Sequence, residues 1–458
     1  EDVERLGDVT WAGAKAEAMA MSRQETLANA ASLWLERSTL DELIRLLRGE
    51  GFTVVGPRLD QGAIVYGEIE RASDLPRGWT DDQKPGKYRL ENSGGEAYFE
   101  YNVGPHSWKQ FFFPPRLAVE RAKREENGGW TFSRPEPSDE RYALLGVRAC
   151  ELAAIAVQDR VMINGPYVDR EYAARRESAL IIAVNCTVAA ETCFCTSMGS
   201  GPRCQADFDL ALTETEQGFV LEVGTEAGWE IAARLEHCEA SPDQLASADR
   251  LRHRAEDQIS KEMSNDGIRD LLLNNLNHPH WDKVAARCLS CTNCTMVCPT
   301  CFCSTVNDVS ELAGDEVERV RQWDSCFNLE FGYTAGGTVR NSIRNRYRQW
   351  LTHKLASWHD QFDTSGCVGC GRCITWCPVG IDLTEEVEAI RQQPAKRREV
   401  PLPQPRPDAC VVPGEVAADQ SNRPRSVGQT IDERQRGASD SAEAQQDASI
   451  ADGGTDRE

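Results

Sequence analysis

The chain has 458 residues, enough for about two or three domains. Its 51 Lys and Arg face 73 Asp and Glu, and a formal net charge of −22 argues against a nucleic-acid binder or a binder of anionic membranes. The sequence has no long apolar run and no signal-peptide pattern, so we expect a cytoplasmic protein without membrane insertion. In that compartment its 18 cysteines indicate metal ligands rather than disulfides.

The first hundred residues combine helical and strand patterns. Residues 24–48 carry leucines at helical spacing and predict one or two amphipathic helices. Short alternating strands are expected at 52–57, 63–69 and 96–103. The aromatic segment WKQFFFPP at 108–115 is expected to pack in a core rather than to face a partner.

Buried strands dominate the next part of the chain. YALLGV at 142–147 and LIIAVN at 180–185 are continuous apolar runs, and a segment of helical character, 148–162, follows the first. Two further strands are expected at 207–214 and 218–224. This order is typical of an α/β domain, in which ligands bind beyond the carboxyl ends of the strands.

From about residue 250 the chain is expected to be mainly helical. Within the long insert 299–366, one helix is predicted at 338–358, where apolar residues recur every four positions. The residues of this apolar stripe are Val339, Ile343, Tyr347, Leu351 and Leu355. Basic residues occupy the other faces, which are either solvated or a docking surface for an acidic partner: Arg340, Arg344, Arg346, Arg348 and Lys354.

The expected fold class is α+β, in three parts. An N-terminal α/β domain at 1–250 is followed by a mainly helical domain at 251–396 that contains a two-cluster ferredoxin-like module. Residues 397–458 are poor in large apolar side chains and predict a disordered C-terminal tail. Cys410 lies in this tail and is not expected to be a ligand.

Two stretches repeat one cysteine spacing, C-x2-C-x2-C-x3-C followed by proline. This is the bacterial ferredoxin pattern for [4Fe-4S] clusters, in which the fourth cysteine of each run binds the other cluster. Structural zinc is the competing interpretation, but zinc ribbons use two separated C-x2-C knuckles. Cluster one is therefore expected at Cys288, Cys291, Cys294 and Cys377, and cluster two at Cys367, Cys370, Cys373 and Cys298.

The sequence around these motifs predicts electron transfer without a substrate site. Apolar neighbours such as Leu289, Val368 and Trp376 would keep both clusters dry. The chain has no Walker loop and no HExxH motif, and GSGPRC lacks the strand and helix that a dinucleotide site needs. We therefore expect an electron relay and no catalytic residue in this chain.

Several segments resemble the beta subunit of sulfhydrogenase-type cytosolic nickel–iron hydrogenases, a dicluster electron-transfer subunit. They include RCLSCTNCTMVCPTCFCSTVNDV, TSGCVGCGRCITWCPVGIDLTEEV, LLGVRACELAAIAVQDRVMINGPYVD and NCTVAAETCFCTSMGSGP, and the resemblance covers roughly residues 100–390. The electron-transfer subunit of anaerobic sulfite reductase is similar over much of this region. The resemblance implies a hetero-oligomer in which a flavin subunit handles NAD(P)H and hydrogenase small and large subunits complete the path.

A third cluster is expected on the N-terminal domain. Cys150 and Cys186 follow the ends of two predicted strands, and the resemblance includes VRACEL and CFC. The expected ligands are Cys150, Cys186, Cys193 and Cys195; the alternative is that all four are small buried residues. Three further thiols, Cys301, Cys303 and Cys326, are expected to pack near a cluster and tune it rather than to bind iron.

The predicted function is a non-catalytic electron-transfer subunit of an oxidoreductase complex. It would relay single electrons between the nickel–iron hydrogenase module and a flavin/NAD(P)H diaphorase subunit. One alternative keeps the relay and replaces the hydrogenase by a siroheme-type sulfite reductase. The others are an iron–sulfur redox sensor or scaffold, and a self-sufficient oxidoreductase with its own flavin.

Overall fold

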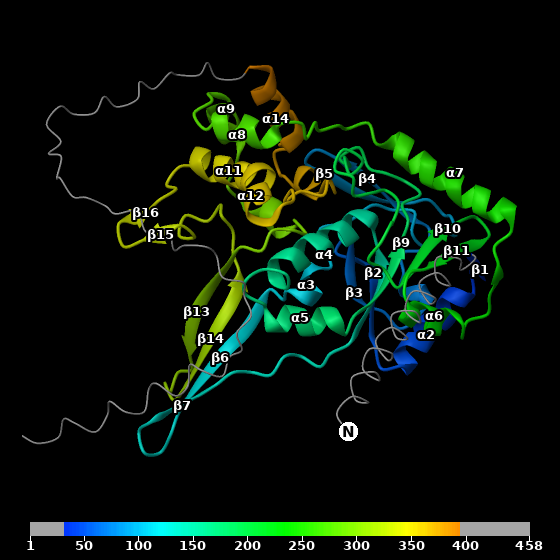
Figure 1. Ribbon diagram of the computed structural model, residues 1–458, viewed down its shortest axis with the longest axis horizontal. Helices are drawn as coiled ribbons and strands as arrows, with labels where there is room; N and C mark the ends of the chain where they lie inside the picture. The colour runs from blue at the N-terminus through cyan, green and yellow to red at the C-terminus, as the bar shows by residue number, and fades with distance from the viewer. Residues whose placement is uncertain (1–31, 394–458) are drawn as a thin grey trace, which may run out of the picture. The chain divides into compact units, whose positions relative to one another are not determined.

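An eight-stranded mixed sheet organises the first part of the chain in the computed structural model, which describes residues 32–393 (Figure 1). The strand order is β12-β1-β11-β10-β9-β8-β2-β3, and the central strands β2, β8, β9 and β10 are parallel. Every residue of β8, β9 and β10 is buried, as expected for strands covered on both faces. The strands are β1 (Leu33–Glu36), β2 (Thr53–Asp60), β3 (Ala63–Glu68), β8 (Tyr142–Val147), β9 (Leu180–Val184), β10 (Leu210–Glu214), β11 (Gly218–Val223) and β12 (Cys238–Glu239).

Helices cover both faces of this sheet. Successive residues of a strand alternate between the faces, so Ile182 packs with α2 and α6 while Ile181 packs with α3, α4 and α5. The segment 108–115 is part of the second core, and the prediction that its aromatic side chains are buried is confirmed for Trp108, Phe112 and Phe113. The helices are α2 (Thr39–Gly49), α3 (Lys109–Phe112), α4 (Ala149–Met162), α5 (Arg170–Glu177) and α6 (Glu226–Ala232).

The helix predicted at 24–48 is wrong in part. Residues 24–31 lie outside the described residues, and α2 accounts only for the end of the segment. Leu33, Trp34 and Leu35 form β1 instead, which pairs antiparallel with β11. Pairing with a distant strand thus overrides a local pattern that fits a helix.

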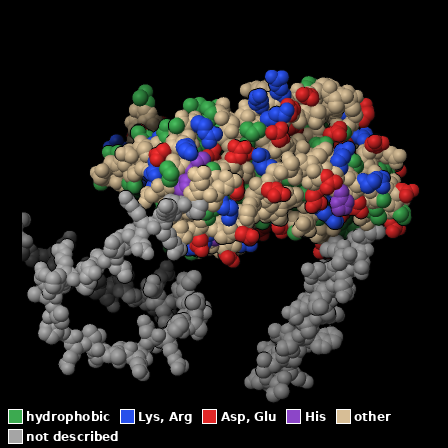
Figure 2. All heavy atoms as spheres, turned by 90° about the horizontal axis from the view of Figure 1, so that it is seen from above, with side chains coloured by type: hydrophobic (Ala, Val, Ile, Leu, Met, Phe, Trp, Pro, Cys, Tyr) green, Lys and Arg blue, Asp and Glu red, His purple; other side chains and the backbone are tan. Residues whose placement is uncertain are grey.

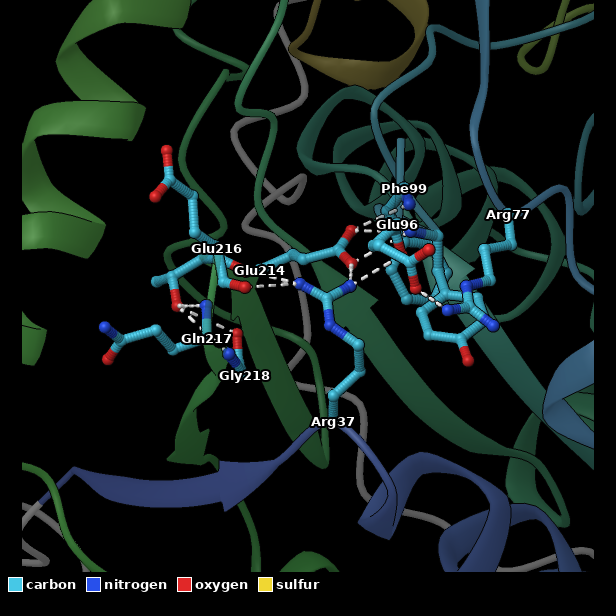
Figure 3. Close-up of polar contacts among 10 residues, drawn as sticks. Arg37, Arg77, Glu96, Phe99, Glu214, Glu216, Gln217 and Gly218 are labelled. Atoms are coloured by element: carbon cyan, nitrogen blue, oxygen red, sulfur yellow. Dashed lines mark hydrogen bonds and ion pairs between the residues drawn. The ribbon is translucent and has the colours of Figure 1, made fainter. Parts of the chain in front are cut away.

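The strand predicted at 96–103 is also absent, because a buried carboxylate takes the place of a neighbouring strand. Glu214 accepts hydrogen bonds from the backbone N–H groups of Tyr98 at 2.9 Å and Phe99 at 2.8 Å, and forms an ion pair with Arg37 at 2.8 Å (Figure 3). Glu96 lies beside them in an ion pair with Arg77. The segment is therefore irregular, with Tyr98 and Phe99 buried and Glu96 exposed.

A four-stranded antiparallel sheet joins parts of the chain that are far apart in sequence. Its order is β13-β14-β6-β7, and Figure 1 shows it extending away from the eight-stranded sheet. Ion pairs cross between β6 and β14, such as Arg121 with Glu318 at 3.0 Å and Lys123 with Glu316 at 2.9 Å. The part of the chain expected to be mainly helical therefore contributes two long strands. The strands are β6 (Arg116–Arg124), β7 (Trp130–Ser133), β13 (Ser304–Ser310) and β14 (Glu316–Trp323).

Helix α7 (Pro242–Gln258) packs on β1 and β11 of the eight-stranded sheet through Ala248. The helices that follow it surround both cysteine motifs, and their shared core contains Leu272, Trp281, Tyr347, Leu355 and Ile390. These helices are α8 (Ile268–Asn274), α9 (His280–Arg287), α10 (Asn293–Met296), α11 (Ile343–Thr352), the π-helix η2 (His353–Ser357), α12 (Trp358–Phe362), α13 (Arg372–Thr375) and α14 (Leu383–Gln392). Small elements complete the described part: the 3-10 turn η1 (Ala72–Asp74) and the hairpins β4 (Trp79–Lys84) with β5 (Lys87–Asn92) and β15 (Tyr333–Thr334) with β16 (Gly337–Thr338).

The helix predicted at 338–358 is present, but its basic residues differ in exposure. α11 begins at Ile343 after the N-cap Ser342, so Val339 lies outside the helix and is 62% exposed. The side chains of Arg346 and Lys354 are buried, so for these two residues both alternatives, a solvated face and a docking surface, are wrong. Partly exposed side chains remain at Arg340, Arg344 and Arg348, and for these three both alternatives stay predictions.

The surface mixes charges of both signs. Figure 2 shows basic and acidic side chains interspersed on the face that it displays. No helix between residues 32 and 393 combines the length and apolarity needed to cross a membrane. The tail predicted to be disordered, 397–458, lies outside the described residues. The expected mixture of helices and sheets is confirmed.

Candidate iron–sulfur site

The two cysteine motifs fold into the same loop. In the first, Ser290 and Thr292 have positive φ values of 53° and 69°, and Thr292 precedes the short helix α10. In the second, Gly369 and Gly371 occupy the equivalent positions with φ values of 64° and 75°, and Gly371 precedes α13. Left-handed backbone at non-glycine residues is costly and concentrates at functional sites. The repetition means that both motifs wrap their first three cysteines around a centre in the same way.

Four cysteines of the predicted cluster one line a single apolar cavity. Cys288, Cys291, Cys294 and Cys377 all border it. Burial first, and then negative charge on Cys288, Cys377 and Cys291, raises the pKa of Cys294 well above its usual range. These sulfurs therefore lie close to one another, and a bound cation would be needed to hold them as thiolates.

The same cavity offers two hydrogen-bond donors that have no partner. Tyr347 and Trp350 line it, and neither the Tyr347 hydroxyl nor the Trp350 Nε1 has a hydrogen-bond acceptor among the described residues. Both side chains are buried. Buried donors normally find an acceptor, so the cavity fits a group that presents acceptors, such as the sulfur atoms of an iron–sulfur cluster.

The cysteines of the predicted cluster two also come together. Burial first, and then negative charge on Cys367, Cys370 and Cys298, raises the pKa of Cys373 well above its usual range. Cys298 belongs to the first motif but lies with three cysteines of the second, as Cys377 of the second lies with the first. The exchange of fourth cysteines is the arrangement that the ferredoxin pattern predicts.

The loop carrying Cys193 and Cys195 packs directly on the second motif. Phe194 N–H donates to Gly369 O at 2.9 Å, and Ser200 Oγ donates to Val368 O at 2.6 Å. A Cβ at Gly369 would lie 2.6 Å from Phe194 O, and one at Gly371 would lie 2.5 Å from Thr192 O. The second motif therefore has glycine where the first has Ser290 and Thr292, because the N-terminal loop leaves no room for a side chain.

Of the four N-terminal cysteines, Cys150 and Cys195 pack with Cys370 in one core cluster, and that all four hold a third cluster stays a prediction. Cys150 is in the first turn of α4, and Cys186 follows β9. Burial raises the pKa of Cys193; a hydrogen bond from Ala190 N–H lowers it, and negative charge on Cys186 and Cys370 raises it further. Burial first, and then negative charge on Cys193, Cys186 and Cys370, raises the pKa of Cys195. Burial and charge on Cys370 raise the pKa of Cys150 well above its usual range. The ends of two strands and one loop thus bring together the residues predicted for a third cluster.

Cys204 joins this group and was not expected from the sequence. It is buried, and burial first, and then negative charge on Cys186, raises the pKa of Cys204 above its usual range. The backbone N–H of Cys204 donates to Asn185 Oδ1 at 2.8 Å, which holds it beside the end of β9. The only signal in the sequence is its place shortly after CFC.

A buried ion pair connects the N-terminal sheet with the second motif. Arg372, between Cys370 and Cys373, pairs with Glu151, the residue after Cys150, and their side chains are 0% and 1% exposed. Glu151 also accepts hydrogen bonds from Tyr66 Oη and Trp108 Nε1, both at 2.9 Å. Arg372 Nη1 has no partner among the described residues. Like Tyr347 Oη and Trp350 Nε1, this donor is free to bind an acceptor, in this case one that lies beside Cys370.

The three additional thiols form close sulfur contacts. Cys301 hydrogen-bonds with Cys298, and Cys303 hydrogen-bonds with Cys326. The hydrogen bond from Cys326 lowers the pKa of Cys303 to about 7. Lys109 donates to the backbone oxygens of Cys298 at 3.1 Å and Cys301 at 2.9 Å. That these thiols tune a cluster without binding iron stays a prediction.

Comparison with known proteins gives two matches. A family model described as a 4Fe-4S dicluster domain matches residues 287–381, which contain all eight motif cysteines. Sulfhydrogenase 2 subunit beta of Pyrococcus furiosus is 29% identical over 351 residues, covering 76% of this chain and 98% of the relative. No solved structure shows significant similarity. The resemblance expected from the sequence is confirmed: the chain contains a 4Fe-4S dicluster domain and is a homologue of the sulfhydrogenase beta subunit.

Proposed function

We propose that the chain relays single electrons between the nickel–iron module of a hydrogenase complex and a flavin/NAD(P)H subunit. It would bind two [4Fe-4S] clusters through the eight motif cysteines and would contain no catalytic residue of its own. The similarity to a sulfhydrogenase beta subunit over most of the chain supports a place in a hydrogenase complex of several subunits. The proposed complex is therefore a hetero-oligomer.

The observation that carries the proposal is the duplicated loop. Ser290 and Thr292 in one motif, and Gly369 and Gly371 in the other, have the same left-handed backbone, and each motif supplies its fourth cysteine to the other group. When bound, each [4Fe-4S] cluster accepts and releases one electron without a change in its ligands. The chain's residues would hold two such groups next to each other, with apolar side chains such as Val368 and Ile374 packed around them.

The exposure of the cysteines suggests an order along the relay. Cys291 is exposed, and its neighbour Leu289 is 61% exposed, so cluster one would lie nearest to a partner. Cys298 is buried, and Cys370 lies next to Cys150 and Cys195. Electrons would then pass from cluster one to cluster two and on to the N-terminal group.

We further propose that Cys150, Cys186, Cys193 and Cys195 hold the third cluster of this relay. Their convergence beside Cys370 supports a site that continues the path. Cys204 is a fifth sulfur close to Cys186, and it competes with the four for a ligand position. The unpartnered Nη1 of Arg372 offers a donor next to the group.

Metal analysis of the native complex tests the partner. The complex would be purified without oxygen through a tag on this chain. Stoichiometric nickel supports the hydrogenase relay, whereas siroheme without nickel would transfer the same function to a sulfite reductase. If neither is present, the proposed partner is wrong. Reversible reduction without loss of the clusters would then favour an electron relay over a redox sensor.

Iron analysis of the isolated chain tests the number of clusters. About twelve iron atoms per chain are expected for three four-iron clusters, and about eight would exclude the third. Substitution Cys193→Ser should lower the iron content by about four atoms. Cys238→Ser is the matched control, because Cys238 is exposed in β12 and belongs to none of the groups.

A further inference from the structure

Lys354 is a buried lysine in an unusual turn. It lies in η2, a π-helical segment between α11 and α12, and is 5% exposed. Single π-helical turns are rare and are frequently found at functional sites. The sequence shows Lys354 only as one of several basic residues, so its burial needs an explanation.

The amino group of Lys354 connects the two cysteine motifs. Nζ donates to Cys298 Sγ at 3.1 Å, to Thr300 Oγ1 at 3.2 Å and to Gly366 O at 2.7 Å. Cys298 is the fourth cysteine of the first motif, and Gly366 directly precedes the first cysteine of the second. Lys354 therefore contacts both chain segments that supply the ligands of the proposed cluster two.

The amino group of Lys354 faces three acceptors, the number that the charged form of lysine can satisfy. Thr300 Oγ1 donates its own proton to Gly366 O at 2.6 Å, so it accepts from Lys354. Together with Cys298 Sγ and Gly366 O, this gives three acceptors for one nitrogen, and only the charged form of lysine has three N–H donors. An ammonium group at this position would satisfy all three acceptors and would lie 3.1 Å from Cys298 Sγ.

This ammonium has no carboxylate partner among the described residues. No ion pair of residues 32–393 includes Lys354, although many other cations of the chain form one. A buried unpaired charge is costly, and a thiolate or an iron–sulfur cluster carrying negative charge would compensate it. The nearest sulfur, that of Cys298, belongs to cluster two.

Cluster one has a different environment. The donors in its cavity, Tyr347 Oη and Trp350 Nε1, are neutral. The charge of the buried Arg346 opposes the burial that raises the pKa of Cys288. Arg346 nevertheless donates its hydrogen bonds to Ser290 Oγ at 3.3 Å and to Arg340 O at 3.0 Å rather than to a sulfur. Charged donors stabilise added negative charge more than neutral ones do.

We propose that Lys354 makes cluster two the higher-potential cluster of the pair, so that an electron shared between them rests at Cys298, Cys367, Cys370 and Cys373. This inference rests on the proposed function, because it requires both clusters to be bound. An ammonium next to one ligand sulfur favours the reduced cluster, which carries one more negative charge. Lys354 is thus a residue that sets the direction of electron transfer within the chain.

Potentiometric titration followed by electron paramagnetic resonance tests the proposal on the anaerobic full chain. Substitution Cys370→Ser identifies the signal of cluster two, which is expected to be the signal with the higher midpoint potential in the wild type. Lys354→Met should move that potential to a more negative value and leave the other unchanged. Lys354→Arg keeps the charge, so its cluster-two potential should stay close to that of the wild type.

The control is Lys283→Met, which removes an exposed lysine from α9 and should change neither potential. A lower potential for the signal altered by Cys370→Ser overturns the proposal even if Lys354→Met does not fold. Equal potentials in Lys354→Met and the wild type overturn it as well. Absence of two reducible four-iron clusters in the wild type would instead reject the proposed function.

Discussion

Phe194 and Gly369 join the two cysteine-bearing parts of the chain through a backbone hydrogen bond of 2.9 Å. Ser200 Oγ binds the carbonyl of Val368 at 2.6 Å, and the hydroxyls of Thr192 and Thr375 lie 2.8 Å apart. These contacts cluster at the point where the second motif turns. The N-terminal loop therefore supports the shape of the second motif.

Substitution Gly369→Ala should disrupt this junction. Its φ is +64°, and a Cβ would lie 2.6 Å from Phe194 O and 2.7 Å from Cys195 Cα, so backbone on one side must move. Strain and overpacking together should lower the free energy of unfolding by roughly 2–5 kcal/mol. Thermal unfolding without oxygen and the iron content of the chain would measure the effect.

Gly94 provides a matched control for this substitution. Its φ is +65°, and a Cβ there would meet no atom within 4 Å. Gly94→Ala should cost only the left-handed backbone term, roughly 1 kcal/mol, and leave the iron content unchanged. Equal losses of thermal stability in the two variants would mean that the contact with the N-terminal loop contributes nothing.

Substitution Glu151→Gln should strongly destabilise the chain. It leaves Arg372, which is fully buried, without its charged partner, and removal of one partner of a buried pair costs roughly 3–5 kcal/mol. The midpoint of thermal unfolding would record the loss. Asp360→Asn removes one of the two carboxylate partners of the exposed Arg269 and should leave the midpoint unchanged. A small effect of Glu151→Gln would show that the other hydrogen bonds of Arg372 compensate.

The local parts of the site could be predicted from the sequence. Cysteine spacing locates the two ferredoxin-type loops because each loop is formed by consecutive residues. The buried strands β8 and β9 could be predicted as well, and with them the strand-end positions of Cys150 and Cys186. In these cases the residues that form the sequence pattern are the same consecutive residues that form the structural element.

Features that depend on distant contacts could not be predicted. Cys204 joins the N-terminal group through a hydrogen bond to Asn185, and Lys354 reaches Cys298 through a π-helical turn, neither of which leaves a pattern in neighbouring residues. The pairing of β14 with β6 likewise joins charged strands that carry no apolar alternation. Tertiary contacts decide such features, and the local sequence only permits them.

Asp81 should make stability depend on pH. Burial raises its pKa from 3.8 to about 6, Oδ2 has no partner among the described residues, and Oδ1 accepts from Asn102 N. Between these values the folded chain holds a proton that the unfolded chain has lost, so stability falls as pH rises from about 4 to 6 and stays lower above. This carboxyl should contribute roughly 2–3 kcal/mol to the difference.

Thermal unfolding at pH 5 and pH 7 would test this dependence. Asp81→Asn removes the titrating group, so the variant should lose part of the decrease in stability between the two pH values and exceed the wild type at pH 7. An unchanged difference between the two pH values would assign the dependence to other groups.

Substitution Tyr347→Phe should act on cluster one alone. Burial raises the pKa of the Tyr347 hydroxyl well above its usual range, so it remains a donor, and it has no acceptor among the described residues. If it donates to a cluster sulfur, its removal should lower the midpoint potential of cluster one by roughly 20–60 mV, the equivalent of one hydrogen bond. Potentiometric titration would measure the shift, and the potential of cluster two should not change.

Tyr101→Phe is the control for this substitution. The Tyr101 hydroxyl is also buried without a partner among the described residues, but it does not border the cavity of cluster one, so both potentials should stay the same. Tyr347→Phe would give a different result if the Tyr347 hydroxyl has no acceptor even when the cluster is bound. Its removal would then raise the free energy of unfolding by roughly 1 kcal/mol and leave the potential of cluster one unchanged. The two measurements together therefore distinguish a sulfur acceptor for this hydroxyl from a packing defect.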